Sequence, residues 1–527
     1  MEPQAGGWLL STCELATLPC VQSFAPSIVQ GCAAWPRTHR GRFRLPSGHF
    51  PHSAEADLKV IHRITPSVLA LVLLVPGAVR AADFYVSLTG SDTNPGTLDQ
   101  PFRTVGRGQT AAAAGDTVFI RGGVYTIAGT SGTMGINFTK SGQPDRRINY
   151  FAYPNETPIF DLFGLLPNAR VTGFNVACSW IHIRGLELRG VQQIVTGDSW
   201  GVRIQGSNNL IERLNVHHGE APGFFITSGA NNLILNCDSH HNYDPLEGGG
   251  NGDGFGCHSD DGGNVISGCR GYANSDDGFD FISAARSCTA EKSWAFTNGW
   301  IPDTTQGAGN GAGFKSGGFG TDTGTFPAVI PRHTIRQCVA FGNRSQGFYA
   351  NHHPGGIDFL NNTAFRNQSN FDMLADVGTS SHKIRNNIAM GMGGTINRLT
   401  GGTATFNSWN LPVTVSADDF MNVAEAEALA PRQADGSLPN VGFMRLVATS
   451  DLIDKGENVG LAFAGAAPDL GAYESGLLTT GSGGASGSGG AGVGGRTGSG
   501  GAATGGAMSS GTGGGAGPAT GGGSVST

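Results

Sequence analysis

Short apolar strands that end in polar turns recur along residues 83–475, where helical periodicity is almost absent. Apolar and polar positions alternate within each strand, which is the period of a half-buried β-strand. The same turn position holds an asparagine at Asn274, Asn298, Asn343 and Asn367. The segments that superpose on this pattern are NNLIERLNVHHG (208–219), NNLILNCDSHHN (231–242), GNVISGCRGYAN (263–274), HTIRQCVAFGN (333–343), IDFLNNTAFRN (357–367) and HKIRNNIAM (382–390).

A second strand follows each turn and carries a phenylalanine, which a glycine precedes in every copy but the last. Successive phenylalanines are 31, 24, 35, 34 and 23 residues apart. A period that varies in this range is typical of a parallel β-helix whose loops differ in length, whereas a β-propeller would have repeats of about 40–45 residues and tight hairpins. We therefore predict an all-β fold, a right-handed parallel β-helix, with stacked phenylalanines about 4.8 Å apart inside it. The pairs are Gly223-Phe224, Gly254-Phe255, Gly278-Phe279, Gly313-Phe314, Gly347-Phe348 and Asn370-Phe371.

Composition adds a C-terminal tail to this picture. Glycine accounts for 86 of the 527 residues, and 22 of the 47 residues from 481 to 527 are glycine. Such a segment buries too little apolar surface to offset its ordering entropy, so residues 476–527 are predicted to be a disordered tail or linker. The glycine elsewhere argues against a helical bundle, and its lack of a Gly-X-Y period excludes collagen. A net charge of -7 provides no basic surface for nucleic acid.

The N-terminal region has the features of a secretory signal. Lys59 and Arg63 precede an apolar run, Val68 to Val75, that small residues follow. This order predicts a signal peptide at 59–81, cleaved after Ala81, and the run is too short for a transmembrane segment. Residues 1–58 lack a clear hydrophobic period. We therefore interpret them as a non-native extension, which results from a translation start assigned upstream of the true one. We expect a secreted, extracellular monomer with 82–475 as its parallel β-helix domain and a tail that is a candidate for surface attachment.

Acidic residues concentrate in the repeats where the phenylalanine register is clearest. The segment NGDGFG carries Asp253, and NSDDGFDF carries Asp276, Asp277 and Asp280. In the next repeat, GAGFKSGG, Lys315 directly follows the phenylalanine. When the repeats are aligned on phenylalanine, Asp253 and Asp277 share one position on neighbouring coils. Asp280 and Lys315 share another.

This arrangement of charges predicts a cation site. Four carboxylates within one or two coil spacings repel one another strongly unless a cation neutralises them, and their oxygens suit Ca²⁺ above all. A bound cation would also lower the pKa of Lys315, and a lysine so depressed can act as a general base. The structural alternative is that aspartates merely cap the turns, as they do in many β-solenoids. Four acids and a lysine in register across three coils favour the functional interpretation.

Three other groups of residues have a structural interpretation that we favour over a functional one. Cysteines at equivalent strand positions predict an interior ladder, although disulfides are permitted outside the cell. Paired histidines at turn ends predict stacked rings rather than a metal cluster, and two acids after the Asp253 repeat predict a solvated turn rather than a second cation contact. These groups are Cys237, Cys269 and Cys338; His217-His218, His240-His241 and His352-His353; and Asp260-Asp261.

In its motifs the chain resembles the family 9 polysaccharide lyases, pectate lyases with a right-handed parallel β-helix. The resemblance covers most of 83–475, and its specific part is NSDDGFD with GFKSGG. The other segments that carry it are shared more widely among secreted β-helix proteins. They are DFYVSLTGSDTNPGTLDQPFRTV, AGDTVFIRGGVYT, APRQADGSLP, SDLIDKGENVG and APDLGAYE.

The resemblance implies a secreted, Ca²⁺-dependent pectate lyase that cleaves an acidic polysaccharide, polygalacturonate, by β-elimination. It implies that Lys315 is the base and that the catalytic Ca²⁺ is bound by Asp253, Asp276, Asp277 and Asp280. The chain departs from the family at His258, where a lysine is frequent, which leaves the substrate subsites open. Two alternatives also stay open: a lyase or epimerase on another uronate polymer such as alginate, and a non-catalytic β-helix that binds polysaccharide.

Overall fold

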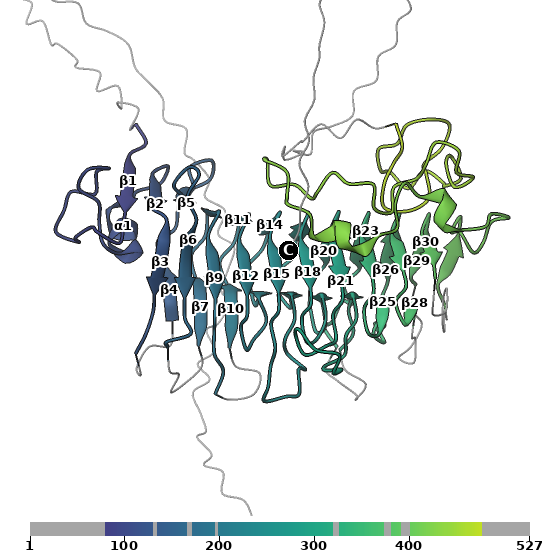
Figure 1. Cartoon of the computed structure of the whole chain (residues 1–527), viewed down its shortest axis with the longest axis horizontal. Coiled ribbons are helices and arrows are strands. Elements are labelled where there is room, and N and C mark those ends of the chain that lie inside the picture. The colour runs from purple at the N-terminus through teal and green to yellow at the C-terminus, as the bar shows by residue number, and fades with distance from the viewer. Residues whose placement is uncertain are drawn as a thin grey trace, which may run out of the picture. The chain divides into compact units, whose positions relative to one another are not determined.

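The computed structural model describes residues 80–129, 134–165, 171–194, 199–319, 326–373, 381–391 and 401–476. Up to Thr405, the described chain winds into coils that stack along one axis (Figure 1). Residues 1–58, the predicted signal peptide except for its last two residues, and the predicted tail beyond residue 476 lie outside the described residues. No described helix is long and apolar enough to cross a bilayer.

Three parallel sheets form the walls of the coils, and successive strands in each sheet come from successive coils. The described strands of the first sheet, in spatial order, are β1 (Asp83–Val86), β2 (Thr117–Ile120), β5 (Ile148–Ala152), β8 (Ile181–Arg184), β11 (Leu210–Glu212), β14 (Leu233–Leu235), β17 (Asn264–Ser267), β20 (Cys288–Glu291), β23 (His333–Arg336), β26 (Ile357–Leu360), β29 (Lys383–Arg385) and β31 (Thr403–Thr405). Those of the second sheet are β3 (Gly123–Thr126), β6 (Pro158–Asp161), β9 (Glu187–Arg189), β12 (Asn215–His217), β15 (Asp238–His240), β18 (Arg270–Tyr272), β21 (Trp294–Phe296), β24 (Val339–Phe341), β27 (Thr363–Phe365) and β30 (Ile388–Met390). Those of the third sheet are β4 (Met134–Phe138), β7 (Thr172–Val176), β10 (Trp200–Ile204), β13 (Phe224–Ile226), β16 (Phe255–Cys257), β19 (Phe279–Asp280), β22 (Phe314–Lys315), β25 (Gln346–Tyr349) and β28 (Ser369–Asp372).

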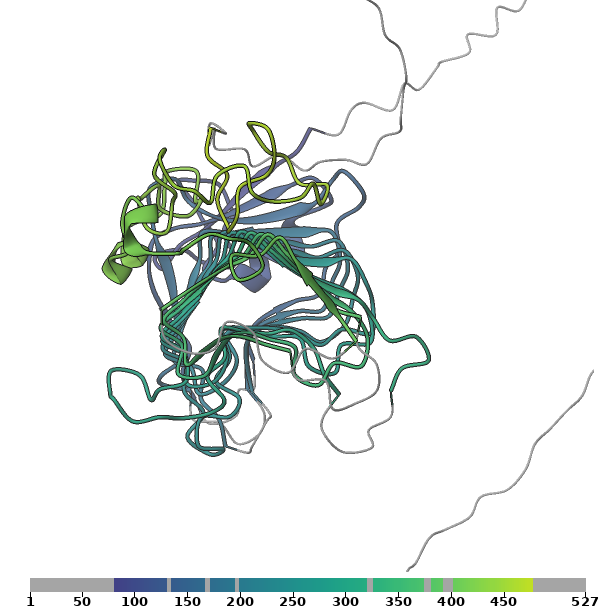
Figure 2. The same ribbon diagram turned by 90° about the vertical axis from the view of Figure 1, so that its right-hand side faces the viewer.

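Each coil passes from the first sheet to the second, then to the third, and the end-on view shows the coils superposed (Figure 2). This arrangement confirms the predicted parallel β-helix. A short helix, α1 (Val105–Ala111), packs against β1, β2 and β4 at the N-terminal end. Of its residues only Val105 and Gly108 are buried, which agrees with the few apolar residues in this segment.

The predicted phenylalanine column lies inside the third sheet. The rings of Phe224, Phe255, Phe279, Phe314 and Phe348 are almost completely buried. Their centroids are separated by 4.9, 4.9, 4.5 and 5.1 Å along this series, and neighbouring rings are within 15° of parallel. Burial of such large side chains supplies much of the hydrophobic stabilisation of the coils.

The glycines before these phenylalanines allow the coils to approach one another. A Cβ atom on Gly254 would lie 2.6 Å from the carbonyl oxygen of Gly278, and one on Gly278 would lie 2.7 Å from that of Gly313. Real Cβ atoms do not come this close to a carbonyl oxygen, so a larger residue would force the backbone to move. The glycine ladder is therefore required by the spacing of the strands rather than by an unusual φ angle.

A ladder of buried asparagines runs beside the glycines, at the turn from the second sheet to the third. The side-chain amide of Asn298 donates to Oδ1 of Asn343 at 2.9 Å, and Asn343 donates to Asn367 in the same way, also at 2.9 Å. Each amide also donates to a backbone carbonyl of the preceding coil, for example from Asn343 to Ala295. The ladder satisfies polar groups that the turn would otherwise bury unpaired.

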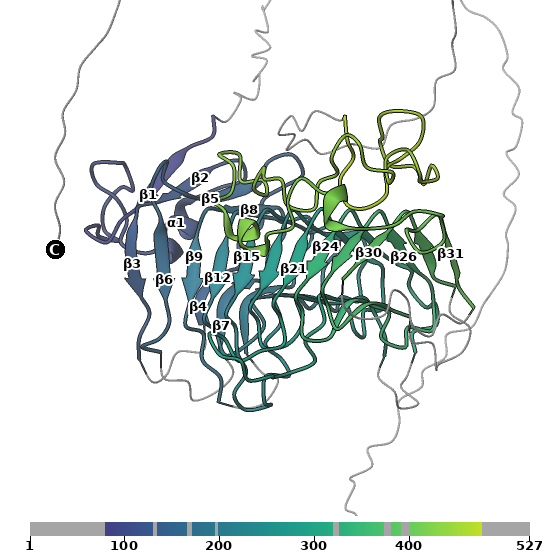
Figure 3. The same ribbon diagram turned by 45° about the vertical axis from the view of Figure 1, so that its right-hand side comes forward.

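The β-helical coils end before the predicted limit of residue 475. The last strand, β31, ends at Thr405, and the chain from 406 to 476 runs back along the outside of the second sheet (Figure 3). This segment contains two 3₁₀ helices, η1 (Ala417–Asp419) and η2 (Glu425–Leu429). Its Phe443 and Leu470 pack in one cluster with Trp294 and Phe341 of the coils. The predicted domain of 82–475 thus contains the coils and a segment that covers them.

Of the cysteines in the described ranges, four are free and two form a disulfide. Cys237, Cys269 and Cys338 are buried and free, as the predicted interior ladder requires, and so is Cys178. The amide of Cys237 donates to Sγ of Cys269 at 3.4 Å, and the amide of Cys269 donates to Oγ of Ser293 at 3.1 Å, so a serine takes the place between Cys269 and Cys338. Cys257 and Cys288, from neighbouring coils, form a disulfide that spacing alone could not assign. This bond joins β16 of the third sheet to β20 of the first.

Substitution of Gly278 by alanine should destabilise the protein by about 1–3 kcal/mol, because the new Cβ overpacks the ladder. It would meet the carbonyl oxygen of Gly313 at 2.7 Å and Nδ2 of Asn298 at 2.8 Å. Gly262→Ala is the matched control, since its nearest neighbour, Arg286 Cβ, lies at 3.7 Å. Chemical denaturation measures both changes. Equal stability of the two variants would contradict the packing argument.

Candidate active site

The predicted acidic residues meet at the junction of the second and third sheets. Asp253 lies two residues before β16, and Asp276 and Asp277 lie in the turn just before β19. Asp280 in β19 pairs in register with Lys315 in β22, and Phe279 beside it points into the core. Because side chains alternate across a strand, the buried phenylalanines force Asp280 and Lys315 to the outer face. The shared positions predicted from the sequence are therefore confirmed.

Three of the carboxylates converge tightly. Oxygens of Asp253, Asp276 and Asp277 all lie within 4.8 Å of one another, and these residues are 4%, 1% and 0% exposed. Lys315 lies beside them, with Nζ 3.1 Å from Oδ2 of Asp277 and 3.1 Å from Oδ2 of Asp280. Asp280 is thus placed with the lysine, at the edge of the group of three.

Backbone amides hold one oxygen of each carboxylate. The amide of Asp277 donates to Oδ1 of Asp253 at 3.1 Å. The amides of Asn310 and Ala312 donate to Oδ1 of Asp276 at 2.5 Å and of Asp277 at 2.7 Å. The second oxygen of each side chain has no such backbone donor among the described residues, and Oδ2 of Asp277 has only the ion pair with Lys315.

Sequence reasoning missed the loop that supplies two of these donors. The guanidinium of Arg344, from the following coil, donates to the carbonyl oxygens of Gly309 at 2.5 Å and Ala308 at 3.2 Å. Gly309 has a φ of +51°, and a Cβ there would lie 2.7 Å from Oδ1 of Asp276. Every residue except proline has a backbone N–H, so residue type does not reveal a backbone donor. The only indication in the sequence was the glycine-rich segment QGAGNGAG, which suggests that this loop lies close to another part of the chain.

The electrostatics of the group follow from burial. Burial, together with the charges of Asp276, Asp280 and Asp277, raises the pKa of Asp253 well above its usual range. Burial, with the charge of Asp277, likewise raises the pKa of Asp276. For Lys315, burial acts to lower the pKa, but the charges of Asp280 and Asp277 outweigh it and raise the pKa. When they are ionised, the four buried carboxylates carry more negative charge than the single ammonium group of Lys315 can neutralise.

The donor set fits a hard divalent cation. Ca²⁺ takes carboxylate oxygens as ligands, and the three converging aspartates supply only such oxygens. The backbone amides bind Oδ1 of each carboxylate, which leaves Oδ2 of Asp253 and Asp276 available as ligands, while Oδ2 of Asp277 is shared with Lys315. The residues present therefore fit the ion that the sequence predicted.

The other predicted groups have structural roles. His217 stacks on His240 with centroids 4.9 Å apart, and His240 stacks in turn on Tyr272. In the described part of the chain, three potential metal-ligating atoms come within 4.8 Å of one another at Asp253, Asp276 and Asp277, and no such group includes these histidines. His353 is buried and accepts from the amide of Gly318. Asp260 and Asp261 are exposed in a turn, as expected.

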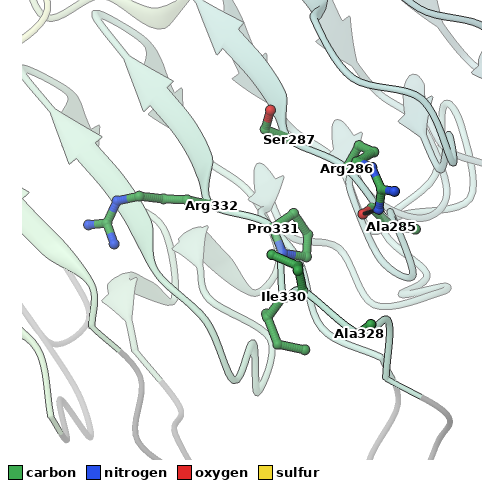
Figure 4. A pocket seen from close by; sticks show the side chains of 8 residues that line it. Ala285, Arg286, Ser287, Ala328, Ile330, Pro331 and Arg332 are labelled. Atoms are coloured by element: carbon green, nitrogen blue, oxygen red, sulfur yellow. Dashed lines mark hydrogen bonds between the residues drawn. The ribbon is translucent and has the colours of Figure 1, made fainter. Parts of the chain in front are cut away.

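A surface pocket of about 590 Å³ lies apart from these residues. It is lined by the turn 285–287 and by 328–332. Figure 4 shows the side chains of Arg286 and Arg332 pointing in different directions, and Arg332 is paired with Asp358. The described residues that line the pocket include none of the predicted site residues.

Comparison with known proteins identifies the family. Residues 84–387, more than half of the chain, match the family described as Pel9A-like, right handed beta helix region. The chain belongs to this family. Pectate lyase L of Dickeya chrysanthemi is 34% identical to it over 413 residues, which are 76% of this chain and 92% of that protein. The predicted resemblance to the family 9 polysaccharide lyases is thereby confirmed.

Two solved structures also match this lyase. The crystal structure of pectate lyase Pel9A has a TM-score of 0.67 at 33% identity and covers 76% of this chain and 97% of its own. The structure of a rhamnogalacturonan lyase has a TM-score of 0.65 at 36% identity and covers 70% of this chain and 97% of its own. The chain is therefore a polysaccharide lyase, which decides against the alternative of a non-catalytic binding protein.

Asp253→Asn should stabilise the lyase in the presence of chelator, because it removes one negative charge from a buried cluster of carboxylates that repel one another. The folded-state pKa of Asp253 is raised, so its destabilising effect is absent well below pH 4, where the carboxyl is protonated in both states, and develops as the pH rises above about 4. The difference in Tm between variant and wild type should therefore grow with pH. Added calcium should raise the Tm of the wild type more than that of Asp253→Asn. Asp261→Asn, at an exposed turn, is the control. A calcium response equal in all three proteins would contradict the site.

Proposed function

We propose that this lyase is a secreted, calcium-dependent pectate lyase that cleaves polygalacturonate by β-elimination with Lys315 as the base. The observation that supports it is the single lysine held by Asp277 and Asp280 at the edge of three buried carboxylates. The signal-like segment 59–81 supports secretion. A monomeric state, and a surface-attachment role for the glycine-rich tail, belong to the same proposal.

The chemistry of the substrate explains the need for a base at this position. In polygalacturonate the hydrogen on carbon 5 lies next to the carboxylate carbon, so it is weakly acidic. Neutral Lys315 would take this proton on Nζ. The electron pair of the C5–H bond would form a double bond between carbons 4 and 5, and the bond from carbon 4 to its glycosidic oxygen would break. That oxygen would take a proton, leaving one new chain end and one unsaturated uronide.

The surroundings of Lys315 orient it for this step. Asp277 and Asp280 both hold Nζ at 3.1 Å, so the long side chain has one position rather than many. Asp253, Asp276 and Asp277 would hold the calcium ion, with Asp280 as a further candidate ligand. Bound calcium would neutralise the carboxylates that otherwise raise the pKa of Lys315, and would pair with the uronate carboxylate as negative charge develops beside it.

A second candidate substrate is favoured by the match to a rhamnogalacturonan lyase. The backbone of rhamnogalacturonan alternates galacturonate with the neutral deoxysugar rhamnose. The same elimination at galacturonate would cleave it, so the roles proposed for Lys315 and the aspartates do not change.

The direct test is to follow the absorbance of the unsaturated product on polygalacturonate, rhamnogalacturonan and alginate, with chelator and with calcium added back. We expect product from at least one galacturonate polymer, loss of activity in chelator, and recovery with calcium. No product from any uronate polymer would refute the proposed function. Activity that chelator leaves unchanged would refute the calcium requirement.

Lys315→Ala should lower kcat by about 10²–10⁴-fold, the contribution of a well-placed general base. The acidic neighbours raise the pKa of Lys315, and only the neutral amine accepts a proton, so kcat/KM of the wild type should increase with pH into the alkaline range. The control is Lys383→Ala, an exposed lysine of β29 that should leave kcat unchanged. Calcium binding measured by calorimetry separates loss of the base from loss of the site. Full activity of Lys315→Ala would exclude it as the base.

A further inference from the structure

Two outward side chains of the third sheet flank the proposed base. Strand register pairs Lys315 in β22 with Asp280 in β19 on one side and with Tyr349 in β25 on the other. Phe348, next to Tyr349 in the chain, is fully buried in the core. Because side chains alternate across a strand, Tyr349 points to the same outer face as Lys315. Tyr349 is only half-buried, so part of its side chain faces outward.

The amino group of Lys315 is held on the side away from Tyr349. Its Nζ lies 3.1 Å from Oδ2 of Asp277 and 3.1 Å from Oδ2 of Asp280, and both aspartates belong to the preceding coil. Tyr349 comes from the following coil. Neighbouring strands are about 4.8 Å apart, so the strands of Asp280 and Tyr349 are separated by two spacings, about 10 Å. Nζ and the tyrosine therefore approach a sugar bound at this face from different sides.

The chemistry of the elimination calls for a proton donor on the side of the sugar opposite the base. In the usual chair form of galacturonate, the hydrogen on carbon 5 and the oxygen on carbon 4 are both axial, and they point to opposite faces of the ring. The glycosidic oxygen leaves as a strongly basic alkoxide unless it receives a proton. A side chain that faces the base across the sugar and donates a proton to this oxygen would therefore accelerate the cleavage.

A tyrosine hydroxyl at this position has the properties of such a donor. Its ordinary pKa is about 10, so it carries its proton at neutral pH, and tyrosine is one of the side chains that act as general acids. Asp277 and Asp280 lie on the same side as the base and accept from Nζ of Lys315. Tyr349 is the outward side chain that follows Lys315 in the register, on the opposite side.

We infer that Tyr349 is the general acid of the elimination and protonates the glycosidic oxygen on carbon 4. The inference rests on the proposed function, in which Lys315 is the base. As the bond between carbon 4 and this oxygen breaks, the O–H bond of Tyr349 breaks and its proton passes to the oxygen, while Nζ of Lys315 carries the proton from carbon 5. The products are the unsaturated uronide, a new hydroxyl group, an ammonium and a tyrosinate. Transfer of one proton from the ammonium to the tyrosinate through water restores both side chains.

The experiment compares kcat and KM on two substrates with calcium present. The first is the galacturonate polymer that the wild type cleaves. The second is an oligogalacturonide whose terminal carbon 4 carries a 4-nitrophenoxy group, because nitrophenolate leaves without needing a proton. Tyr349→Phe removes the hydroxyl and keeps the ring. Tyr153→Phe is the matched control, since Tyr153 follows β5 of the first sheet and its ring packs against Phe119.

On the polymer, Tyr349→Phe should lower kcat by about 10²–10⁴-fold with little change in KM, as expected for loss of a general acid. On the nitrophenyl substrate the same variant should keep nearly the kcat of the wild type, whereas Lys315→Ala should lose activity on both substrates. Calcium binding measured by calorimetry, and the Tm, should stay those of the wild type in Tyr349→Phe. Tyr153→Phe should match the wild type in every measurement.

Two results would overturn the inference and leave the elimination intact. Wild-type activity of Tyr349→Phe on the polymer would show that the hydroxyl is not needed. An equal loss of kcat on both substrates would show that the hydroxyl positions the sugar rather than protonates the leaving oxygen. Full activity of Lys315→Ala would instead refute the proposed function, because the elimination would then have another base.

Discussion

Parallel hydrogen bonding between neighbouring coils holds equivalent residues one strand spacing apart, and the whole molecule is organised by this repeat. In the ladders, a side chain contacts side chains of the same type on the coils before and after it. Phenylalanine stacks on phenylalanine at 4.5–5.1 Å, and asparagine donates to asparagine. Glycine leaves room for the neighbouring carbonyl. A residue type that suits one coil therefore suits the next, which is why the sequence repeats despite loops of different length.

The same spacing makes the acidic group unfavourable by itself and brings together carboxylate oxygens that suit a cation. Residues that stack at this distance normally avoid like charge, yet Asp253 and Asp277 occupy equivalent positions and Asp276 adjoins them. Their pKa values are raised because burial and mutual repulsion both oppose ionisation. The ladders on either side keep the carboxylates in place although the charges repel. A rigid solenoid can in this way hold a site that a more flexible fold would relax.

The register of the site could be predicted because it depends on side-chain types at fixed distances from a buried phenylalanine. Alignment on Phe255, Phe279 and Phe314 was enough to place Asp253 with Asp277 and Asp280 with Lys315, as the structure confirms. The alignment did not separate the roles of the acids: three converge, while Asp280 pairs with the lysine. That difference depends on where each side chain points, and a one-dimensional register contains no such information.

What the sequence alone determined was the β-helix, its stacked core, the ladders and the residues that gather at the site, because each of these follows from residue type repeated at a regular position. Only the tertiary structure decided the rest. Arg344 holds the loop whose amides bind Asp276 and Asp277, Cys257 pairs with Cys288, and the chain after Thr405 folds back over the second sheet. These features depend on the path of irregular loops between coils. Backbone hydrogen bonds and the direction in which the chain leaves each strand determine the path of these loops. A repeating pattern of side chains contains no information about either.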